Sequence, residues 1–215
     1  MISLVLNAVI AYLLGSVSGS MLMGRLRGVD IRKSGSGNAG GTNAFRTQGP
    51  VFALGVVLID IGKGALAAGL LPMLNLAGGD GTFSNGVQAM VCGFMAVIGH
   101  CFPVWYGFRG GKGAAAAVGA LAVIQPIVLI PMFLVWVLTL TVTGWVGLST
   151  ILASLSLVPA FAAWGESGQQ LWFAMLLAAF IIGLHHANIR RMLDGSESRF
   201  DKVRLVNWFG RDGRS

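Results

Sequence analysis

Three short stretches of this sequence combine glycine with polar and basic side chains that suit anion binding. The first is SGSGNAGGTN, Ser34 to Asn43, which Arg46 follows. Glycines let backbone N–H groups turn toward an anion, hydroxyl and amide groups add donors, and an arginine adds a bidentate cation. This pattern predicts a phosphate-binding loop, and a flexible loop without a ligand is the alternative. The glycines also match GxGxxG, but dinucleotide binding needs a strand before that pattern, and an apolar helix is expected here.

The second stretch is FRGGKG, Phe108 to Gly113, and the helix-forming run Ala114–Ala117 follows it. Free N–H groups at a helix start, the helix dipole and the Lys112 ammonium all favour a bound phosphate. The stretch is not a Walker loop, since Tyr106 and Gly113 stand where that pattern needs glycine and Ser or Thr. A pair of cations at a membrane edge is the alternative.

The third stretch is HHANIRR, which begins at His185 and is followed by Asp194, Gly195 and Glu197. On a helix, His185, Asn188 and Arg191 share one face. A packing or capping role is the alternative for the histidine. The face nevertheless predicts a polar site at a helix end.

The elements that position these stretches follow from composition. Apolar residues make up 55% of the chain and charged residues only 11%, against about 25% charged residues in ordinary soluble domains. The apolar runs are continuous rather than alternating, which favours membrane helices over membrane strands. The sequence therefore predicts an all-α integral membrane protein, a single polytopic membrane domain over residues 1–215.

The basic residues set the expected orientation. They gather in the blocks 25–46, 109–112 and 190–214, which the positive-inside rule places in the cytoplasm. The N-terminus is then outside, the C-terminus is cytoplasmic, and Asp80 and Glu166 mark outer loops. The expected cytoplasmic segments are the loops 25–50 and 107–113 and the tail 189–215. All three anion-binding stretches fall on this one side.

The number of helices depends on the middle of the chain. Four spans are expected outside it: Ile2–Met23, Val51–Leu74, Val87–Tyr106 and Gln169–Asn188. The orientation requires an odd number of crossings between Gly113 and Trp164, and one crossing would leave far more than the roughly 20 residues that a span needs. We therefore expect three short or tilted helices, broken near Gln125–Pro131 and Thr143–Gly144, and seven in total, with five as the alternative.

Other ligand classes are disfavoured. The net charge of +7 flanks membrane spans, so orientation and anionic lipid explain it better than nucleic acid does. Cys92 and Cys101 are about 13 Å apart if they share one helix, too far for a disulfide. We expect neither a metal site nor a cofactor. Asp60 and Lys63 lie deep in a span at helical i,i+3 spacing, which predicts either a structural ion pair or a part of the site.

These residues resemble a known family, the bacterial membrane glycerol-3-phosphate acyltransferases that use acyl phosphate as donor. The likeness covers nearly the whole chain. Besides the three stretches, it includes Asp60-Ile-Gly-Lys-Gly64 and the path from Gly99-His100 through Pro103 to FRGGKG. Two departures are Ala115-Ala116, where the family often has Val-Ala-Thr after GGKG, and His186, where arginine is usual.

The resemblance implies transfer of a fatty acyl group from acyl phosphate to the primary hydroxyl of glycerol 3-phosphate. The products are lysophosphatidic acid and phosphate, and the setting is phospholipid biosynthesis at the bacterial inner membrane with the site facing the cytoplasm. An acyl phosphate is already activated, so the reaction needs no cofactor, metal or nucleophilic serine. The protein is expected to be surrounded by membrane lipid.

The resemblance also implies roles for residues at matching positions. His185 and Asn188 would lie nearest the reacting groups, with His185 or a substrate phosphate as the base. One phosphate would be held by the first stretch and the other by Lys112 and its glycines, and Glu197 would brace an arginine. The expected substrate-binding residues are Ser34, Ser36, Asn38, Thr42, Asn43, Arg46, Gly110, Gly111, Lys112, Gly113, Arg190, Arg191 and Glu197. Asp60, Lys63 and His100 are expected to support the site.

Two other classes compete with an enzyme. A transporter of a phosphorylated small solute would explain intramembrane charges and a basic inner mouth. It should carry matching polar features outside, where only Asp80 and Glu166 are expected. A structural scaffold would not need three glycine-and-cation stretches. The one-sided distribution of charge argues against a transporter, so the enzyme is favoured over both.

Overall fold

The computed structural model describes residues 1–74, 83–165 and 168–204, and every regular element within these ranges is a helix. The predicted all-α class is therefore confirmed for the described residues. Asp80, Glu166 and residues 205–215 of the expected tail lie outside them. The chain forms two compact units, Met1–Ile127 and Val128–Ser215. The expected single membrane domain stays a prediction.

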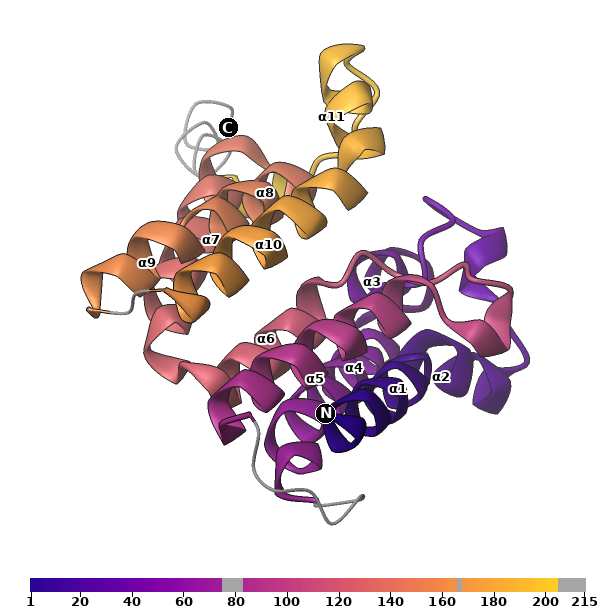
Figure 1. Ribbon diagram of the computed structural model, residues 1–215. Coiled ribbons are helices and arrows are strands. Elements are labelled where there is room, and N and C mark those ends of the chain that lie inside the picture. Colours follow the sequence, from indigo (N-terminus) through magenta and orange to yellow (C-terminus); the bar gives the residue numbers. More distant parts are fainter. Residues whose placement is uncertain (75–82, 166–167, 205–215) are drawn as a thin grey trace, which may run out of the picture. The chain divides into compact units, whose positions relative to one another are not determined.

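The first unit is a bundle in which α1 packs on α5, and α4 packs on both α5 and α6 (Figure 1). Short 3-10 turns separate its longer helices. Its elements are α1 (Ile2–Gly15), α2 (Gly19–Arg27), η1 (Ile31–Lys33), α3 (Gly41–Gln48), α4 (Pro50–Gly69), η2 (Leu71–Met73), α5 (Asn85–Cys101), η3 (Val104–Tyr106) and α6 (Ala114–Ile124). The turn η4 (Pro126–Val128) leads into the second unit.

Glycine brings α1 and α5 into backbone contact. A Cβ on Gly15 would lie 2.6 Å from Cα of Ala96, and a Cβ on Gly99 would lie 2.9 Å from the backbone nitrogen of Ser16. Real Cβ atoms do not approach other atoms so closely, so each position has to be glycine for the helices to meet. Small residues at such crossings stabilise membrane helix pairs through backbone packing.

The predicted span Ile2–Met23 is broken. α1 ends at Gly15, and α2 starts at Gly19 with Ser18 as its N-cap, accepting a hydrogen bond from the backbone N–H of Met21. The two helices together still form one apolar segment long enough to cross a membrane, Ile2–Arg27. Backbone groups freed by a break inside a membrane must be paired within the protein. Asp60 and Lys63 pair the backbone groups at this break, and their contacts are described with the candidate site.

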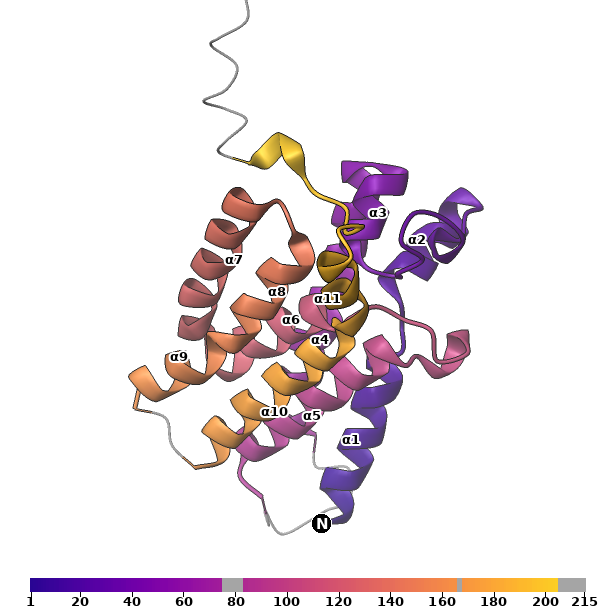
Figure 2. The ribbon, with the colours of Figure 1, turned by 90° about the horizontal axis from the view of Figure 1, so that it is seen from above.

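The second unit contains α7 (Leu129–Thr143), α8 (Val146–Leu155), α9 (Leu157–Ala163), α10 (Gln169–Leu184), α11 (His186–Leu193) and the turn η5 (Asp201–Val203). α7 and α8 lie side by side, and α10 packs on α8 and α9 (Figure 2). α7 ends at Thr143 and is capped by Gly144, whose left-handed φ of 75° suits glycine. The helix breaks predicted near Gln125–Pro131 and Thr143–Gly144 are confirmed.

Five helical segments within the described residues are long and apolar enough to cross a membrane: Ile2–Arg27, Pro50–Met73, Asn85–Tyr106, Pro126–Thr143 and Val146–Ala163. Two further apolar elements accompany them. One is the short helix α6, and the other is the α10–α11 pair, which bends by 52°. The predicted span Gln169–Asn188 is therefore interrupted, since α10 ends at Leu184 and α11 begins at His186.

Candidate functional site

The glycine-rich stretch of the first unit is a short loop that leads into α3. Asn43 is buried, and both ends of its side-chain amide bond backbone groups in or just before this loop. The amide oxygen accepts from the Ser36 N–H at 2.9 Å, while the amide nitrogen donates to the carbonyls of Ile31 at 2.9 Å and Ser34 at 3.1 Å. These three bonds mean that Asn43 shapes the loop from within.

The side chains expected to bind phosphate lie around this loop. Ser34 and Ser36 are exposed, and Asn38 is half-buried. Thr42 lies in the first turn of α3 and Arg46 in its last, where the Arg46 side chain is exposed. The loop therefore presents hydroxyls and an arginine on its accessible side, with Asn43 as its buried support.

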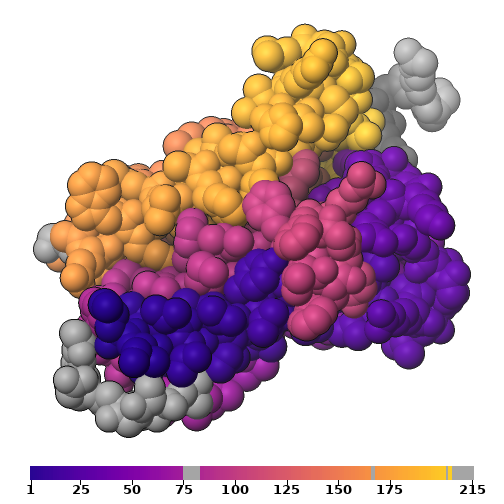
Figure 3. Space-filling model, turned by 45° about the vertical axis from the view of Figure 1, so that its right-hand side comes forward, coloured from indigo at the N-terminus to yellow at the C-terminus, as the bar shows by residue number. Residues whose placement is uncertain are grey.

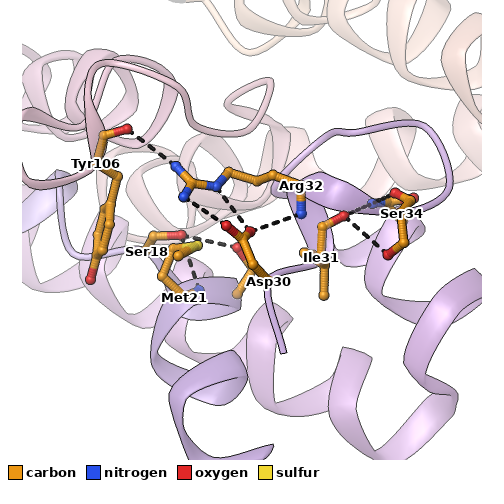
Figure 4. Close-up of polar contacts among 9 residues, drawn as sticks. Ser18, Met21, Asp30, Ile31, Arg32, Ser34 and Tyr106 are labelled. Atoms are coloured by element: carbon orange, nitrogen blue, oxygen red, sulfur yellow. Dashed lines mark hydrogen bonds and ion pairs between the residues drawn. The ribbon is translucent and has the colours of Figure 1, made fainter. Parts of the chain in front are cut away.

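Arg32 connects this loop to the second stretch. Its guanidinium lies between the Asp30 carboxylate, at 2.9 Å, and the carbonyl of Tyr106, at 3.2 Å (Figure 4). The hydrogen bond from Arg32 lowers the pKa of Asp30 from its ordinary value and raises the pKa of Arg32. The pair is thus charged at neutral pH, and it ties two predicted phosphate-binding segments together.

The second stretch is pressed onto the end of α5. The Gly110 N–H donates to the Cys101 carbonyl and the Gly111 N–H donates to the His100 carbonyl, each at 3.1 Å. A Cβ on Gly110 would lie 2.7 Å from Cδ of Pro103, and a Cβ on Gly111 would collide with the ring of His100. Both glycines are therefore required by close packing. α1 holds the residues that precede this stretch, because Tyr12 donates to the Phe102 carbonyl at 2.8 Å.

In Figure 3 the indigo surface of α1 meets the pink surface of the segment that follows α5. Lys112, half-buried, comes at the end of that segment, and Gly113 is the N-cap of α6 with a left-handed φ of 86°. The predicted helix start after Lys112 is confirmed. Free N–H groups and the positive end of the helix dipole are thus next to the lysine.

α4 fixes the position of α6. A Cβ on Gly64 would lie 2.9 Å from the carbonyl carbon of Ala116, and a Cβ on Gly119 would lie 2.8 Å from that of Ile61. The two backbones are in direct contact over about one turn of each helix. The start of α6 is therefore held at a fixed position along α4, and Lys112 directly precedes it.

Asp60, Lys63 and His100 form a buried polar cluster between α4 and α5. The Lys63 ammonium lies 2.8 Å from Oδ1 of Asp60, and Nδ1 of His100 lies 3.3 Å from the same oxygen. The exposed fractions of the three side chains are 1% for Asp60, 3% for Lys63 and 5% for His100. The ion pair, one of the two roles expected for Asp60 and Lys63, is present. Removing one partner of a buried pair typically costs about 3–5 kcal/mol.

This cluster also pairs the backbone groups that are left free at the break between α1 and α2. The N–H of Gly19, at the start of α2, donates to Oδ1 of Asp60 at 3.2 Å, and the Lys63 ammonium donates to the carbonyl of Val17 at 2.7 Å. A carboxylate at a helix start and an ammonium at a freed carbonyl are both favourable. The ion pair therefore stabilises the break between α1 and α2.

In the second unit His185 stands at the bend between α10 and α11. Its side chain is buried, and Nδ1 lies 2.7 Å from the carbonyl of Ile181. Because a carbonyl only accepts, Nδ1 carries the proton, and any proton transfer with a substrate has to use Nε2. His186 is exposed, with Nδ1 2.9 Å from the Gly183 carbonyl.

Asn188 and Arg191 of α11 meet on one carboxylate. The Asn188 side-chain nitrogen and the Nε of Arg191 each donate to Glu197 at 2.6 Å. The expected contact between Glu197 and an arginine is present, whereas the Arg190 side chain is exposed. Asn188 packs on α8 as well, where a Cβ on Gly147 would lie 2.8 Å from its side-chain nitrogen.

The predicted site residues thus form a group in each unit. The first unit brings together the glycine-rich loop, the GGKG segment and the Asp60 cluster, and the second brings together His185, Asn188, Arg191 and Glu197. Sequence reasoning missed Arg32 and Gly147. Neither carries a local signal, because Arg32 bonds a backbone carbonyl and Gly147 matters only for its missing side chain. The described residues contain no group of His, Cys, Asp and Glu able to hold a metal ion.

The chain is similar to known proteins over most of its length. The profile of the glycerol-3-phosphate acyltransferase family matches residues 5–195. The glycerol-3-phosphate acyltransferase of Chlorobaculum parvum is 39% identical, covering 88% of this chain and 93% of that protein. The one of Symbiobacterium thermophilum is 39% identical, covering 93% of this chain and 96% of that protein.

The fold is similar to a solved one. The crystal structure of PlsY (YgiH), an integral membrane glycerol 3-phosphate acyltransferase, in its glycerol 3-phosphate form, gives a TM-score of 0.82 at 34% identity. The match covers 92% of this chain and 96% of that one. The lysophosphatidic acid form of the same enzyme gives a TM-score of 0.80. The chain therefore belongs to the glycerol-3-phosphate acyltransferase family and is an integral membrane acyltransferase.

Proposed function

We propose that this enzyme transfers a fatty acyl group from acyl phosphate to the primary hydroxyl of glycerol 3-phosphate, in phospholipid biosynthesis. The hydroxyl oxygen forms a bond to the acyl carbonyl carbon, and the bond from that carbon to the phosphate oxygen breaks. The hydroxyl proton passes to Nε2 of His185 or to a phosphate oxygen. The products are lysophosphatidic acid and inorganic phosphate.

The observation that carries this proposal is the likeness to one solved enzyme in two forms. Its glycerol 3-phosphate form and its lysophosphatidic acid form correspond to the acceptor and to the acylated acceptor. The likeness extends over nearly the whole chain, so the acceptor and the product are the features that transfer most directly.

The donor is supported by the chemistry of the site residues. Acyl phosphate is a mixed anhydride and needs no protein nucleophile for activation. It does need an anion-binding group for its phosphate besides the one for the acceptor. The first unit offers two such groups, the loop before α3 with Arg46 and the GGKG segment with Lys112 at the start of α6.

We assign the following roles within this reaction. Ser34, Ser36, Asn38, Thr42 and Arg46 bind one phosphate, and Asn43 shapes their loop. Lys112 and the N–H groups around Gly110, Gly111 and Gly113 bind the other. His185 and Asn188 act on the reacting groups, with Arg190 as a further phosphate ligand and Arg191 and Glu197 as their support.

We further propose that the protein crosses the bacterial inner membrane seven times, with the N-terminus outside and the site facing the cytoplasm. The five long apolar segments, α6 and the bent α10–α11 pair supply seven crossing elements. The loops 25–50 and 107–113 and the tail 189–215 are then cytoplasmic. Residues 1–215 form one membrane domain in this arrangement.

Phosphate release by the purified protein in detergent tests the reaction. With acyl phosphate as donor, release should require glycerol 3-phosphate and should fall at least about tenfold in a Lys112→Ala variant, because a charge-assisted phosphate contact is lost. Lys33→Ala is the matched control, since it removes an exposed lysine of the same unit. Release by folded protein that does not depend on glycerol 3-phosphate would contradict the proposal.

A further inference from the structure

We propose that Asp60 and His100 act as positioning residues. They fix the GGKG segment, residues 110–113, on the end of α5, so that the Lys112 ammonium contacts its phosphate. This inference rests on the proposed role of Lys112. Both side chains belong to the apolar helices α4 and α5, and both are buried.

The first step is the orientation of the imidazole. Oδ1 of Asp60 is held in place by the Gly19 N–H and by the Lys63 ammonium. Nδ1 of His100 lies 3.3 Å from this fixed oxygen, a close polar contact that is outside hydrogen-bond geometry. One edge of the ring is therefore directed at α4, and the opposite edge, with Nε2, is directed away from it.

The second step is the contact of that opposite edge with the loop. A Cβ built on Gly111 would collide with Nε2 and would lie 2.8 Å from Cε1, so the ring packs directly against the Gly111 backbone. The Gly111 N–H also donates to the carbonyl of His100 itself. Side chain and backbone of one histidine thus hold the residue that precedes Lys112.

The third step is the geometry of the segment. It is attached at both ends, by Gly110 to the carbonyl of Cys101 and by Gly113 to the start of α6. Between these two points, the His100 ring is the part of α5 that supports Gly111 from below. We expect loss of the ring to shift Lys112 without unfolding either helix. The ion pair alone would need no histidine, since Asp60 and Lys63 already neutralise each other.

The test compares kinetic constants rather than stability alone. His100→Ala should raise the KM for one of the two phosphorylated substrates by about tenfold or more while kcat changes much less, because a displaced Lys112 ammonium loses its charge-assisted contact with the phosphate. His100→Asn retains a nitrogen toward Asp60, and His100→Gln retains one toward Gly111. Neither restores the wild-type KM if both contacts are needed.

Asp60→Asn by itself leaves the Lys63 ammonium buried without its carboxylate, so the fold is at risk. The Asp60→Leu/Lys63→Met double variant removes both charges and also the oxygen that faces His100. Its KM should rise for the same substrate as in His100→Ala. Asn7→Ala is the matched control: Asn7 is buried in the same unit and donates to the carbonyl of Leu71, so its loss lowers thermal stability and leaves both KM values unchanged.

A mutant cycle separates positioning from general damage. In a Lys112→Ala background, His100→Ala should change KM by less than about twofold, since its effect acts through Lys112. Equal effects in both backgrounds, or an unchanged KM in folded His100→Ala, would overturn the inference. Thermal shifts with inorganic phosphate give a second readout, and phosphate should bind His100→Ala more weakly. A protein without acyl transfer whose phosphate binding still depends on His100 would refute the proposed reaction and keep this inference.

Discussion

His185 combines burial, a fixed tautomer and a place at a helix bend. The 52° bend lies at this residue, and the bond from Nδ1 to Ile181 orients the ring. General-base catalysis by a positioned histidine contributes about 10²–10⁴-fold to a rate. We expect His185→Ala to lower kcat by a factor in this range while the variant remains folded.

Single-turnover rates and thermal unfolding in detergent measure the two effects of His185→Ala separately. His186→Ala is the matched control, because that histidine is exposed and should change kcat little. If folded His185→Ala retains the wild-type kcat, the proton goes to a substrate phosphate and His185 has no part in the chemistry.

Glu197 is the carboxylate on which Asn188 and Arg191 converge. Glu197→Gln keeps the shape and one acceptor but loses the charge, and hydrogen bonds to charged groups contribute about 1.5–3 kcal/mol. We expect a lower thermal stability and a lower kcat, with a larger loss in Glu197→Ala. Normal kinetics and stability in Glu197→Gln, measured by phosphate release and by thermal unfolding, would show that the carboxylate braces nothing.

At the scale of elements, glycine contacts decide where the site residues stand. Gly147 lets α8 approach α11, since its missing side chain leaves room for Asn188. In Gly147→Ala the new methyl group displaces Asn188 from Glu197. We expect kcat to fall at least about tenfold, since small misplacements at a reacting centre cost about that much or more.

Gly183→Ala provides the comparison for Gly147→Ala, because a Cβ on Gly183 meets nothing within 4 Å. Alanine is the better helix former by about 0.5–1 kcal/mol, so this variant should be as stable as the wild type or more stable. Similar losses of kcat in both variants would show that the close contact with Asn188 is not the cause.

The segment after α11 is another element with a definite place. The Phe200 N–H donates to the Gly144 carbonyl at 2.8 Å, and the Arg199 guanidinium stacks over the Trp145 ring at 4.5 Å. This segment follows directly after Glu197. Its attachment to the turn between α7 and α8 therefore fixes the carboxylate that supports Asn188.

At the scale of the whole molecule, the number of crossings has a direct test in single-cysteine labelling. Seven crossings place Gln125 outside and Thr143 inside, whereas five crossings keep the whole region from 114 to 164 in one passage. Cys92 and Cys101 are buried and are first replaced by serine. A membrane-impermeant maleimide added to intact cells should then label Gln125→Cys and not Thr143→Cys. Labelling of Thr143→Cys from outside would contradict seven crossings.

The sequence by itself determined the membrane class, the all-α fold, the helix start after Lys112 and the breaks on either side of α7. These features follow from hydropathy, glycine and proline, which act within one or two turns of the chain. The motifs with their resemblance also indicated the family. The charge pattern supplied a topology that stays a prediction.

Only the tertiary structure decided which of these polar side chains are held by contacts within the fold. The Asn43 amide bonds its own loop, and Oδ1 of Asp60 binds Lys63 and the Gly19 N–H and lies 3.3 Å from His100. It also revealed the bend at His185 and the contact of Gly147 with Asn188. Such contacts join residues far apart in the chain, and their geometry depends on how closely two backbones pack, which no local pattern of residue types encodes.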